Sequence, residues 1–557
     1  MDPTQHPDML VRSPLDMLYH WESTRPDAIY LRQPIDGQFH TWTWREVGDE
    51  VRRMAAALQA MNLPPQSKIA LISKNCAHWI LADLATMMAG HVGVPMYPNL
   101  NEDTVRYVLE HSEAKVLFVG KLDTWEDMKG GVPDSVTCIG FPFYGHEDYL
   151  SWDYLTQEHE PLKGKIVRNP DDWASIIYTS GTTGYPKGVI HRFHNMSFAV
   201  SNAVRFINVG QTDRFFSYLP LSHIAERILV EMGSLYSGGT VDFAESLETF
   251  ASDLKRVQPT VFLGVPRIWS KFQQGVLGKM PQAKLDRLLR IPILSGIVKK
   301  KIRQGLGLNQ GRLVFTGAAP TPASLIRWFE RLGIRIQEAY AMTENCCYSH
   351  VTLPNNIRIG AVGQPLPLCE VRLGEDDEIH VRHEALMVGY YKDPEQTAET
   401  LTDDGFLRTG DTGSIDAEGF LRITGRVKDL FKTSKGKYVA PAPIELHLSA
   451  NTFVGQVVVV GDNIPQPIAL ITPSEETKGL SREEIMSSLS KTLTAVNKIL
   501  DQHENVRKVV ILNEEWTVEN GFLTPTMKIK RRIVEGKHRP QYPEWYEGKD
   551  PVLWLKH

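Results

Sequence analysis

Several features that would place a chain in a special class are missing from this sequence. It has only five cysteines, an odd number without the pairwise spacing of a metal site: Cys76, Cys138, Cys346, Cys347 and Cys369. This argues against a disulfide framework and favours reduced thiols in a cytoplasmic protein. No run of about 18 or more apolar residues occurs, so we expect no membrane-spanning helix. The segment 1–14 lacks an apolar core, and we predict no signal peptide there.

An excess of one charge is missing as well. The chain has 61 Lys and Arg against 66 Asp and Glu, a net charge of −5, which gives no reason to expect nucleic acid as a partner. One local basic cluster, 528–532 (Lys-Ile-Lys-Arg-Arg), is either a solvated helix face or part of a site. Peripheral contact with a membrane surface stays open.

What is present is typical of a globular chain with more than one domain. The sequence has 557 residues, of which 42% are hydrophobic and 23% charged, and chains beyond roughly 250–300 residues tend to divide into domains. Apolar residues at helical spacing alternate with short apolar runs that indicate buried strands. The predicted helices are 47–61, 79–88, 104–111, 247–257 and 322–332, and the predicted strands include 68–72, 114–119, 260–265 and 333–339. This rhythm predicts an α/β architecture with largely parallel sheets.

The pattern changes towards the C-terminus. Past Gly360 short strands and turns suggest a small β-rich subdomain. After Arg426 the strands and one long helix, 481–500, are typical of a small α+β domain of about 130 residues. Residues 272–305, rich in Lys, Arg and Leu, are either an inserted helical excursion or plain surface helix.

A glycine-rich loop follows the predicted strand 174–179. Residues 178–188 read Tyr-Thr-Ser-Gly-Thr-Thr-Gly-Tyr-Pro-Lys-Gly. Glycines let backbone N–H groups approach a ligand, and the hydroxyl groups with the Lys187 cation suit a polyphosphate. The loop is not a Walker P-loop, because Gly188 rather than Ser or Thr follows Lys187. Taken alone, it could equally be an ordinary surface loop.

Residues 178–188 resemble the signature of the adenylate-forming superfamily, which includes the AMP-dependent acyl-CoA synthetases, firefly luciferases and the adenylation domains of peptide synthetases. The resemblance covers nearly the whole chain, because further motifs follow in the family's order. It implies an N-terminal adenylate-forming domain (1–426), a hinge (427–429) and a mobile C-terminal domain (430–557). It also implies that the loop binds ATP through Thr179, Ser180, Gly181, Thr182, Thr183, Gly184 and Lys187.

A second motif, 218–227, reads Tyr-Leu-Pro-Leu-Ser-His-Ile-Ala-Glu-Arg. The resemblance places His223 beside the carboxylate to be activated, where an imidazole can orient an anion. The Ala-Glu-Arg that follows is similar to long-chain and bubblegum-type acyl-CoA synthetases. We expect Glu226 and Arg227 to form an internal ion pair rather than to act in catalysis.

Two further motifs are similar to the family's nucleotide-binding turns. The first is Gly317, Ala318 and Ala319, which would lie against adenine, where small side chains permit close approach. The second, 337–344, reads Gln-Glu-Ala-Tyr-Ala-Met-Thr-Glu. From it the resemblance assigns Glu338, Ala339, Tyr340 and Thr343 to the nucleotide and Glu344 to Mg²⁺.

Within 337–344 each role follows from the chemistry of the side chain. Tyr340 would stack on adenine and Thr343 would contact the α-phosphate. One carboxylate, that of Glu344, together with phosphate oxygens is enough for a hard cation. Ala339 and Ala341 stand where glycine is common in the family, which leaves less room in the pocket.

The remaining motifs lie around the end of the large domain. The resemblance places Asp411 on the ribose hydroxyls, has Arg426 contact the ribose as well, and makes Lys428 the pivot of the hinge. In the segment 431–445, which again resembles the long-chain branch, Gly436 would face the pantetheine channel of CoA. Lys435 and Lys437 would meet phosphates, although solvated lysines explain them equally well.

Lys528 matches the family's catalytic lysine, which reaches the acyl carboxylate and the α-phosphate. Its ammonium would stabilise the charge that moves onto phosphorus. Lys530 stands two residues further on and is the alternative catalytic lysine if the motif is aligned out of register. The set of catalytic candidates is therefore Lys528, Thr343, Glu344 and His223.

The resemblance implies a ligase that joins a medium- or long-chain fatty acid to AMP and then to CoA. Its cofactors and co-substrates would be ATP, Mg²⁺ and CoA, and it would be a cytoplasmic monomer or homodimer. Rival hypotheses are an acyl-AMP ligase that delivers to a carrier protein or a downstream enzyme, a ligase for other carboxylic acids, a luciferase-like oxygenase and a non-catalytic adenylate-binding protein. The scattered apolar residues of an acyl pocket give no motif, so chain length cannot be predicted.

Overall fold

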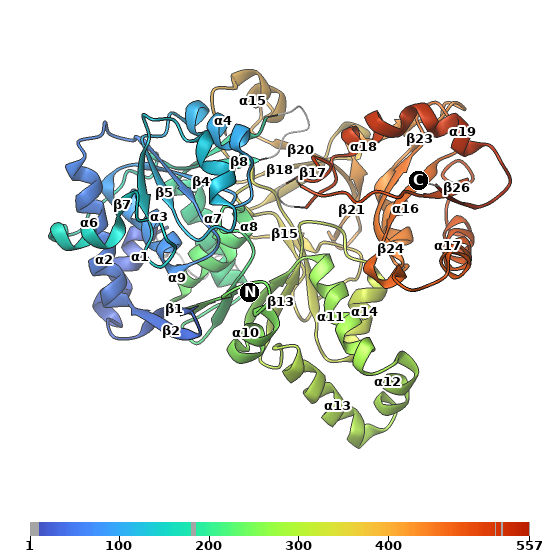
Figure 1. The fold of residues 1–557 in the computed structure, drawn as a ribbon, viewed down its shortest axis with the longest axis horizontal. Helices are drawn as coiled ribbons and strands as arrows, with labels where there is room; N and C mark the ends of the chain where they lie inside the picture. The colour runs from blue at the N-terminus through green and yellow to red at the C-terminus, as the bar shows by residue number, and fades with distance from the viewer. Residues whose placement is uncertain (1–10, 180–184, 519, 525–526, 556–557) are drawn as a thin grey trace.

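The computed structural model describes residues 11–179, 185–518, 520–524 and 527–555. A large N-terminal body contains two sheets with helices packed on them, and a smaller C-terminal domain lies at its side (Figure 1). This mixed α/β architecture confirms the predicted fold class.

The first sheet has eight strands in the order β19-β9-β8-β4-β3-β5-β6-β7. Strands β8, β4, β3, β5, β6 and β7 run parallel, whereas β9 and β19 are antiparallel additions at one edge. The strands are β3 (Lys68–Ile72), β4 (Val92–Met96), β5 (Val116–Val119), β6 (Thr137–Gly140), β7 (Leu150–Ser151), β8 (Trp173–Thr179), β9 (Lys187–Arg192) and β19 (Gly389–Tyr390).

The second sheet has nine strands in the order β16-β15-β14-β13-β12-β10-β11-β1-β2. Its central six strands are parallel, and β2, β15 and β16 are antiparallel edges. The strands are β1 (Ile29–Ile35), β2 (Gln38–Thr43), β10 (Arg214–Ser217), β11 (Thr240–Phe243), β12 (Val261–Gly264), β13 (Leu313–Thr316), β14 (Ile336–Tyr340), β15 (His350–Val351) and β16 (Gln364–Pro365).

One hydrophobic core joins the two sheets. Helix α3 (Ala77–Ala89) is buried along its whole length, and its core cluster includes residues of β1, β3, β5, β8, β10 and β11. Because α3 is covered on all sides, its sequence is apolar all round rather than amphipathic. Other helices of this body are α1 (Pro14–Thr24), α2 (Trp44–Ala60), α4 (Glu102–Ser112), α7 (Phe193–Phe206), α10 (Phe250–Val257) and α14 (Ala323–Arg331).

A four-stranded antiparallel sheet, β17-β18-β20-β21, follows the second large sheet. Its strands are β17 (Glu370–Leu373), β18 (Glu378–Arg382), β20 (Leu407–Ile415) and β21 (Leu421–Arg426), with α15 (Pro394–Thr400) inserted before β20. This is the predicted β-rich subdomain, and its last strand leads directly into the 3₁₀ turn Val427–Asp429.

The C-terminal domain has its own four-stranded sheet and its own core clusters. The sheet pairs β24 (Val454–Val460), β25 (Ile468–Pro473), β26 (Lys508–Ile511) and β27 (Val552–Trp554). Around it lie the hairpin β22 (Phe431–Lys432) and β23 (Tyr438–Val439) and the helices α16 (Pro441–Leu448), α17 (Arg482–Asn497), α18 (Arg531–His538) and α19 (Tyr542–Tyr546).

Residues 272–305 form parts of three consecutive helices: α11 (Pro266–Lys279), α12 (Gln282–Leu289) and α13 (Pro292–Gly305). Helices α12 and α13 pack against each other and project from the large body (Figure 1). Trp269 of α11 and Leu285 of α12 are buried, whereas α13 has no buried residue. The segment is thus a helical excursion whose last helix is plain surface.

The described residues bear on the predictions about disulfides and membrane-spanning helices. All five cysteines are free thiols, and none pairs in a disulfide. Among the described residues, no helix combines the length and apolar character that crossing a bilayer requires.

The expected ion pair between Glu226 and Arg227 is wrong. These residues are consecutive in one helical segment, where neighbours point about 100° apart and do not face each other. Arg227 instead donates both bonds of 2.6 Å to Asp83 on α3 and a third to Ser175 on β8, all buried. Glu226 accepts from the backbone N–H of Tyr218 at 3.0 Å, and burial raises the pKa of its carboxyl to about 8.

Candidate active site

The glycine-rich loop connects two antiparallel strands at the edge of the first sheet. Thr179, the last residue of β8, lies directly opposite Lys187, the first residue of β9. The loop therefore starts and ends at the same place, which holds Lys187 at its base. Ser180, Gly181, Thr182, Thr183 and Gly184, the other phosphate-binding candidates of the loop, lie outside the described residues.

Tyr390 connects this loop to the candidate metal ligand. Its hydroxyl donates a hydrogen bond of 2.9 Å to Glu344 Oε1, and the Lys187 ammonium lies 5.3 Å from the centre of its ring. Lys187 also donates to Gln396 on α15. No sequence motif identifies Tyr390, because β19 is only two residues long and its pairing with β9 is a long-range contact.

Thr343 is held by a buried histidine that the sequence analysis also missed. His191 Nε2 donates to the Thr343 carbonyl oxygen at 2.8 Å, which fixes the turn before Glu344. Burial lowers the pKa of His191 to about 4, so the ring is neutral at pH 7. A neutral ring that donates through Nε2 orients the turn without adding a charge beside the phosphates.

This histidine gives a testable dependence of stability on pH. An unfolded histidine takes up a proton near pH 6.5, but folded His191 stays neutral down to about pH 4. Its contribution to stability is therefore present above pH 6.5 and is lost as the pH falls towards 4, by up to ~1.4 kcal/mol per pH unit. We expect the free energy of unfolding, measured by urea denaturation, to fall less steeply between pH 6.5 and 4.5 in His191→Gln than in the parent protein. Equal slopes would contradict a neutral buried His191.

The nucleoside-binding candidates form a second cluster. Asp411 accepts a hydrogen bond of 2.7 Å from the Tyr340 hydroxyl on one oxygen and one of 2.7 Å from Arg426 Nε on the other. This brings together three residues from β14, β20 and β21 that the sequence predicts separately. Glu338, on the same strand as Tyr340, accepts from the backbone N–H of Gly360 at 2.9 Å, and burial raises its pKa to about 7.

The turn of Gly317, Ala318 and Ala319 follows β13 at the same end of the sheet. A Cβ on Gly317 would stand 3.2 Å from the carbonyl oxygen of Ala339, so glycine allows the two strand ends to approach closely. Ala318 has a φ of 66°, a left-handed conformation that is costly for a residue with a side chain. Such local strain is often found at binding sites.

His223 begins a helical segment that contains a π-helical turn. The segment comprises α8 (Ile224–Glu226), the π-helix Arg227–Met232 and α9 (Gly233–Ser237). His223 Nδ1 accepts from the Ala225 N–H at 3.2 Å, so the neutral ring has its proton on Nε2. Burial, with the Lys528 ammonium as a further cause, lowers the pKa of His223 to about 4. An uncharged N–H donor is therefore available at pH 7.

Lys528 comes from the C-terminal domain but shares the electrostatic environment of the N-terminal clusters. Crowding by protein atoms, followed by the positive charge of Arg426, lowers the pKa of its ammonium, and Asp411 and Glu344 oppose this. The side chain is exposed to solvent. The charges of Arg426, Asp411 and Glu344 act on Lys528, and the charge of Lys528 acts on His223.

Other candidates lie away from this group. Lys428 is exposed in the 3₁₀ turn between the domains. Gly436, with a φ of 77°, is the tip of the hairpin β22–β23, and Lys435 and Lys437 are exposed beside it. Among the described residues, no hydrogen bond or ion pair joins this hairpin to Asp411 or Glu344.

The basic cluster 528–532 is partly solvated and partly engaged in ion pairs. Lys530 and Arg532 are exposed. Arg531 is mostly buried, pairs with Glu445 of α16 at 2.5 Å, and lies 3.6 Å from Asp429 of the interdomain turn. Arg531 therefore anchors the start of α18, three residues after Lys528, to the interdomain turn Val427–Asp429.

The side chains that could bind a metal ion determine which ion fits the site at Glu344. Within the described residues, no group of three or more His, Cys, Asp or Glu side chains converges as a protein cage would require. Glu344 uses one carboxylate oxygen for Tyr390 and keeps the other for a ligand. One carboxylate supplemented by phosphate oxygens and water is the arrangement that Mg²⁺ commonly uses, so the residues present fit Mg²⁺ delivered with a nucleotide.

Comparison with known families defines the class of protein. Residues 18–391 match the AMP-binding enzyme family, and residues 428–549 match the C-terminal domain of AMP-binding enzymes. The chain belongs to the AMP-binding enzyme family. This family comprises adenylate-forming enzymes, as the order of the motifs implies.

Several relatives match over nearly the whole chain. The long-chain-fatty-acid–CoA ligase FadD15 of Mycobacterium tuberculosis is 29% identical, over 94% of this chain and 95% of that protein. The peroxisomal long chain acyl-CoA synthetase 7 of Arabidopsis thaliana is 30% identical, over 93% of this chain and 84% of that protein. The fold is similar to the anthranilate CoA ligase AuaEII in complex with anthranoyl-AMP, with a TM-score of 0.80 at 21% identity, covering 96% and 99% of the two chains.

Proposed function

We propose that this protein activates a long-chain fatty acid with ATP, releasing pyrophosphate, and transfers the acyl group from AMP to CoA. The observation that supports the proposal is the direct contact of Asp411 with Tyr340 and Arg426. The charge of Lys528, from the other domain, also acts on Asp411 and Glu344. A cation from one domain that acts on the predicted ribose and metal sites of the other suits a reaction that joins a carboxylate to a nucleotide. The names of the relatives support a long-chain acid as the substrate.

The first step requires two anions to approach each other. The fatty acid carboxylate attacks the α-phosphorus of ATP, one P–O bond forms, and the bond to pyrophosphate breaks. The Nε2–H of neutral His223 orients the carboxylate, and Lys528 neutralises the charge that builds up between carboxylate and phosphate. Lys187, at the base of the glycine-rich loop, faces the departing pyrophosphate. Mg²⁺ held by Glu344 would supply further neutralisation of the phosphates.

The nucleoside is positioned by the second cluster. Asp411 would accept hydrogen bonds from the ribose, while Tyr340 and Arg426, which already bond its two oxygens, hold the carboxylate in place. No protein nucleophile is needed, because AMP itself is the leaving group of the second step. Positioning and charge neutralisation then account for most of the catalysis.

The second step brings the CoA thiolate to the acyl carbonyl, and AMP leaves. The predicted CoA residues Lys435, Gly436 and Lys437 belong to the hairpin β22–β23, for which no hydrogen bond or ion pair to Asp411 or Glu344 is seen among the described residues. We propose a rotation about Lys428 that replaces Lys528 with the hairpin β22–β23. A monomer or homodimer, and a cytoplasmic location with contact to a membrane, remain predictions.

A panel of acids tests this proposal. With ATP, Mg²⁺ and CoA, we expect AMP and acyl-CoA by mass spectrometry, and kcat/KM should rise from butyrate to palmitate. Each methylene buried in an acyl pocket contributes ~0.8 kcal/mol, or roughly fourfold. Benzoate and acetate serve as controls and should react at least about tenfold more slowly than palmitate, by the same reasoning.

Leaving CoA out of the reaction distinguishes CoA from a carrier protein or a downstream enzyme as the acceptor of the acyl group. Without CoA, we expect acyl-AMP to form and to remain bound, and addition of CoA should convert it to the thioester. If acyl-AMP forms but CoA never discharges it, the acceptor is a carrier protein or a downstream enzyme. If benzoate outruns every fatty acid, the proposed substrate class is wrong.

A further inference from the structure

The projecting helices expose an unusual group of apolar side chains. Ile291, Ile293, Leu294 and Ile297 lie within seven residues at the start of α13, with exposed fractions of 43, 81, 40 and 50%. On the inner side of the same helix, Val298 and Ile302 pack against the core cluster that includes Trp269 and Leu285. The outward apolar group is thus additional to the contacts that hold the helix on the protein.

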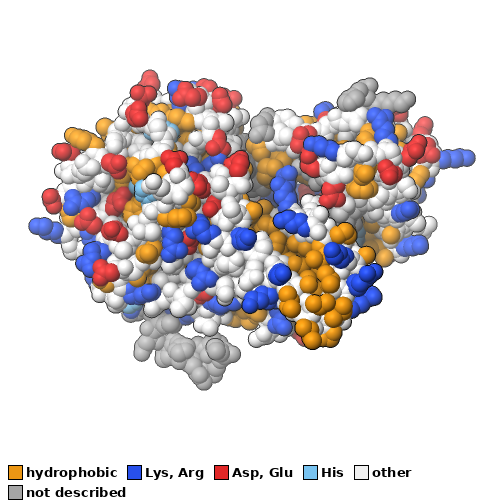
Figure 2. All heavy atoms as spheres, turned by 60° about the horizontal axis from the view of Figure 1, so that its bottom comes forward, with side chains coloured by type: hydrophobic (Ala, Val, Ile, Leu, Met, Phe, Trp, Pro, Cys, Tyr) orange, Lys and Arg blue, Asp and Glu red, His pale blue; other side chains and the backbone are white. Residues whose placement is uncertain are grey.

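Basic residues surround this apolar group. Ile297 is followed three and four residues later by Lys300 and Lys301, which a helix places on the same side. The segment 279–305 has a net charge of +7 in a chain whose total is −5, since its one acidic residue, Asp286, is outnumbered by Lys279, Lys284, Arg287, Arg290, Lys299, Lys300, Lys301 and Arg303. Figure 2 shows the result as a hydrophobic area on the projecting part, rimmed by Lys and Arg.

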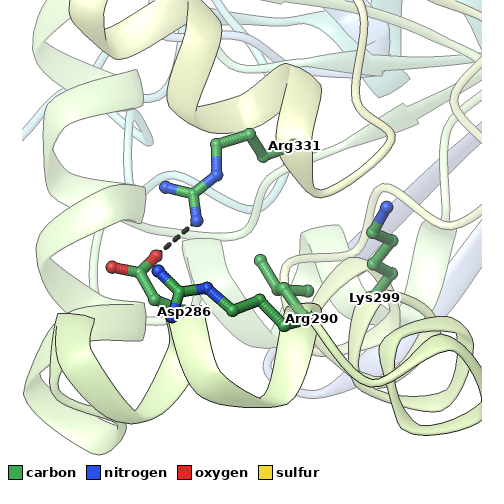
Figure 3. A pocket seen from close by; sticks show the side chains of 5 residues that line it. Asp286, Arg290, Lys299 and Arg331 are labelled. Carbon is green, nitrogen blue, oxygen red and sulfur yellow. Dashed lines mark hydrogen bonds and ion pairs between the residues drawn. The ribbon is translucent and has the colours of Figure 1, made fainter.

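A basic pocket lies on the same projection. It is lined by Asp286, Leu289, Arg290, Lys299 and Arg331, where α12, α13 and α14 meet, and has a volume of about 390 Å³. Arg331 points to Asp286 and pairs with it, as Figure 3 shows, and Arg290 and Lys299 add two further positive charges to the pocket. Such a pocket suits a phosphate group.

We propose that the α12–α13 projection is a membrane-docking surface that binds bilayers containing anionic phospholipid. Ile293, Leu294 and Ile297 enter the acyl boundary, while the surrounding lysines and arginines contact the phosphates of the lipid headgroups. Helices with an apolar face and a Lys- and Arg-rich border bind membrane interfaces in this way.

The charge favours a bilayer over the other occupants of an apolar face. A second copy of the chain would bring an equal positive charge to the interface, and like charges facing each other oppose association. An acidic partner protein would explain the charge but not the outward isoleucines at the tip of a projection. The inference does not rest on the proposed enzymatic function, because it uses no residue of the active site.

Flotation with lipid vesicles tests the proposal on the full-length protein. Vesicles of phosphatidylcholine with about one third phosphatidylglycerol are compared with pure phosphatidylcholine vesicles. We expect binding to the anionic vesicles to be at least about tenfold tighter and to weaken as salt is raised, since exposed charges are screened. Ile293→Asp with Ile297→Asp should abolish binding, and Lys300→Glu with Lys301→Glu should lower it about tenfold or more.

Matched controls separate the surface from general effects of charge and exposure. Leu247→Asp changes a side chain that is 83% exposed elsewhere. Lys491→Glu with Lys498→Glu makes an equal charge change at exposed positions in α17 and at its C-cap. Both should bind vesicles as the parent protein does. The proposal is overturned if the parent protein binds neither vesicle, if the control variants lose binding equally, or if Ile293→Asp with Ile297→Asp only converts a dimer to a monomer.

Discussion

Replacing Lys528 with alanine is expected to slow the formation of acyl-AMP about 100- to 1000-fold, the usual loss when one group that stabilises a transition-state charge is removed. Fatty-acid-dependent exchange between ATP and pyrophosphate measures this step alone. The same variant should still convert synthetic acyl-AMP and CoA to acyl-CoA at a rate within about threefold of the parent. Its effect is confined to the first step because the proposed rotation about Lys428 removes Lys528 before the second.

Lys530→Ala is the matched control for this prediction. Lys530 is two residues away, equally exposed, and is the residue before α18 begins. We expect its exchange rate to stay within about twofold of the parent protein. If Lys530→Ala loses exchange and Lys528→Ala keeps it, the register of the catalytic lysine is wrong by two positions.

Replacing Arg227, the cation of a buried charged group, is expected to produce the largest loss of stability. Arg227 is fully buried, bonds both oxygens of Asp83, donates to Ser175 and lies 3.5 Å from Glu231. Without the guanidinium, Asp83 would be left as an uncompensated buried acid. Breaking a buried pair in this way typically costs 3–5 kcal/mol. Thermal denaturation of Arg227→Met should therefore show a lower Tm and less folded protein on expression.

Two controls show whether the loss comes from the unpaired charge. Arg227→Met with Asp83→Leu removes both charges and should be more stable than Arg227→Met alone, because well-packed apolar residues often replace a buried pair without loss. Arg45→Met breaks the exposed pair Arg45–Asp27, of 2.8 Å, and should change stability by less than ~1 kcal/mol. A double variant less stable than the single would mean that the charges themselves are needed.

Arg227 also connects this stability to the active site. Its bonds join α3, β8 and the π-helical turn that follows His223. One buried guanidinium therefore fixes the relative position of β8, the strand that precedes the glycine-rich loop, and of the segment that begins at His223. The π-helical turn fits this role, since such turns occur mostly at functional sites.

The elements with strong local patterns could be predicted from the sequence. The helix predicted at 79–88 is α3, the strand at 68–72 is β3, and the helix at 481–500 contains α17. Each has a long enough apolar period or run to identify it. Short elements such as β19 gave no such signal, and the sequence analysis therefore missed Tyr390.

In the candidate site, too, some residues could be predicted from motifs and others could not. Tyr340, Asp411 and Arg426 were predicted one by one from ordered motifs, and the structure brings them into direct contact. His191 has no motif, because its role depends only on a carbonyl oxygen 152 residues later in the chain. Glu226 and Arg227 were paired wrongly because adjacency in sequence was taken for adjacency in space.

The sequence by itself determined the class of fold, the order of the motifs and the family, since these depend on residue type and spacing along the chain. Only the tertiary structure decided that Tyr340 and Arg426 bond the two oxygens of Asp411, that Arg227 pairs with Asp83, and that α13 turns isoleucines outward. The reason is physical: charge pairing, burial and exposure depend on distances in space. Those distances are set by how strands and helices pack, and no spacing along the chain records them.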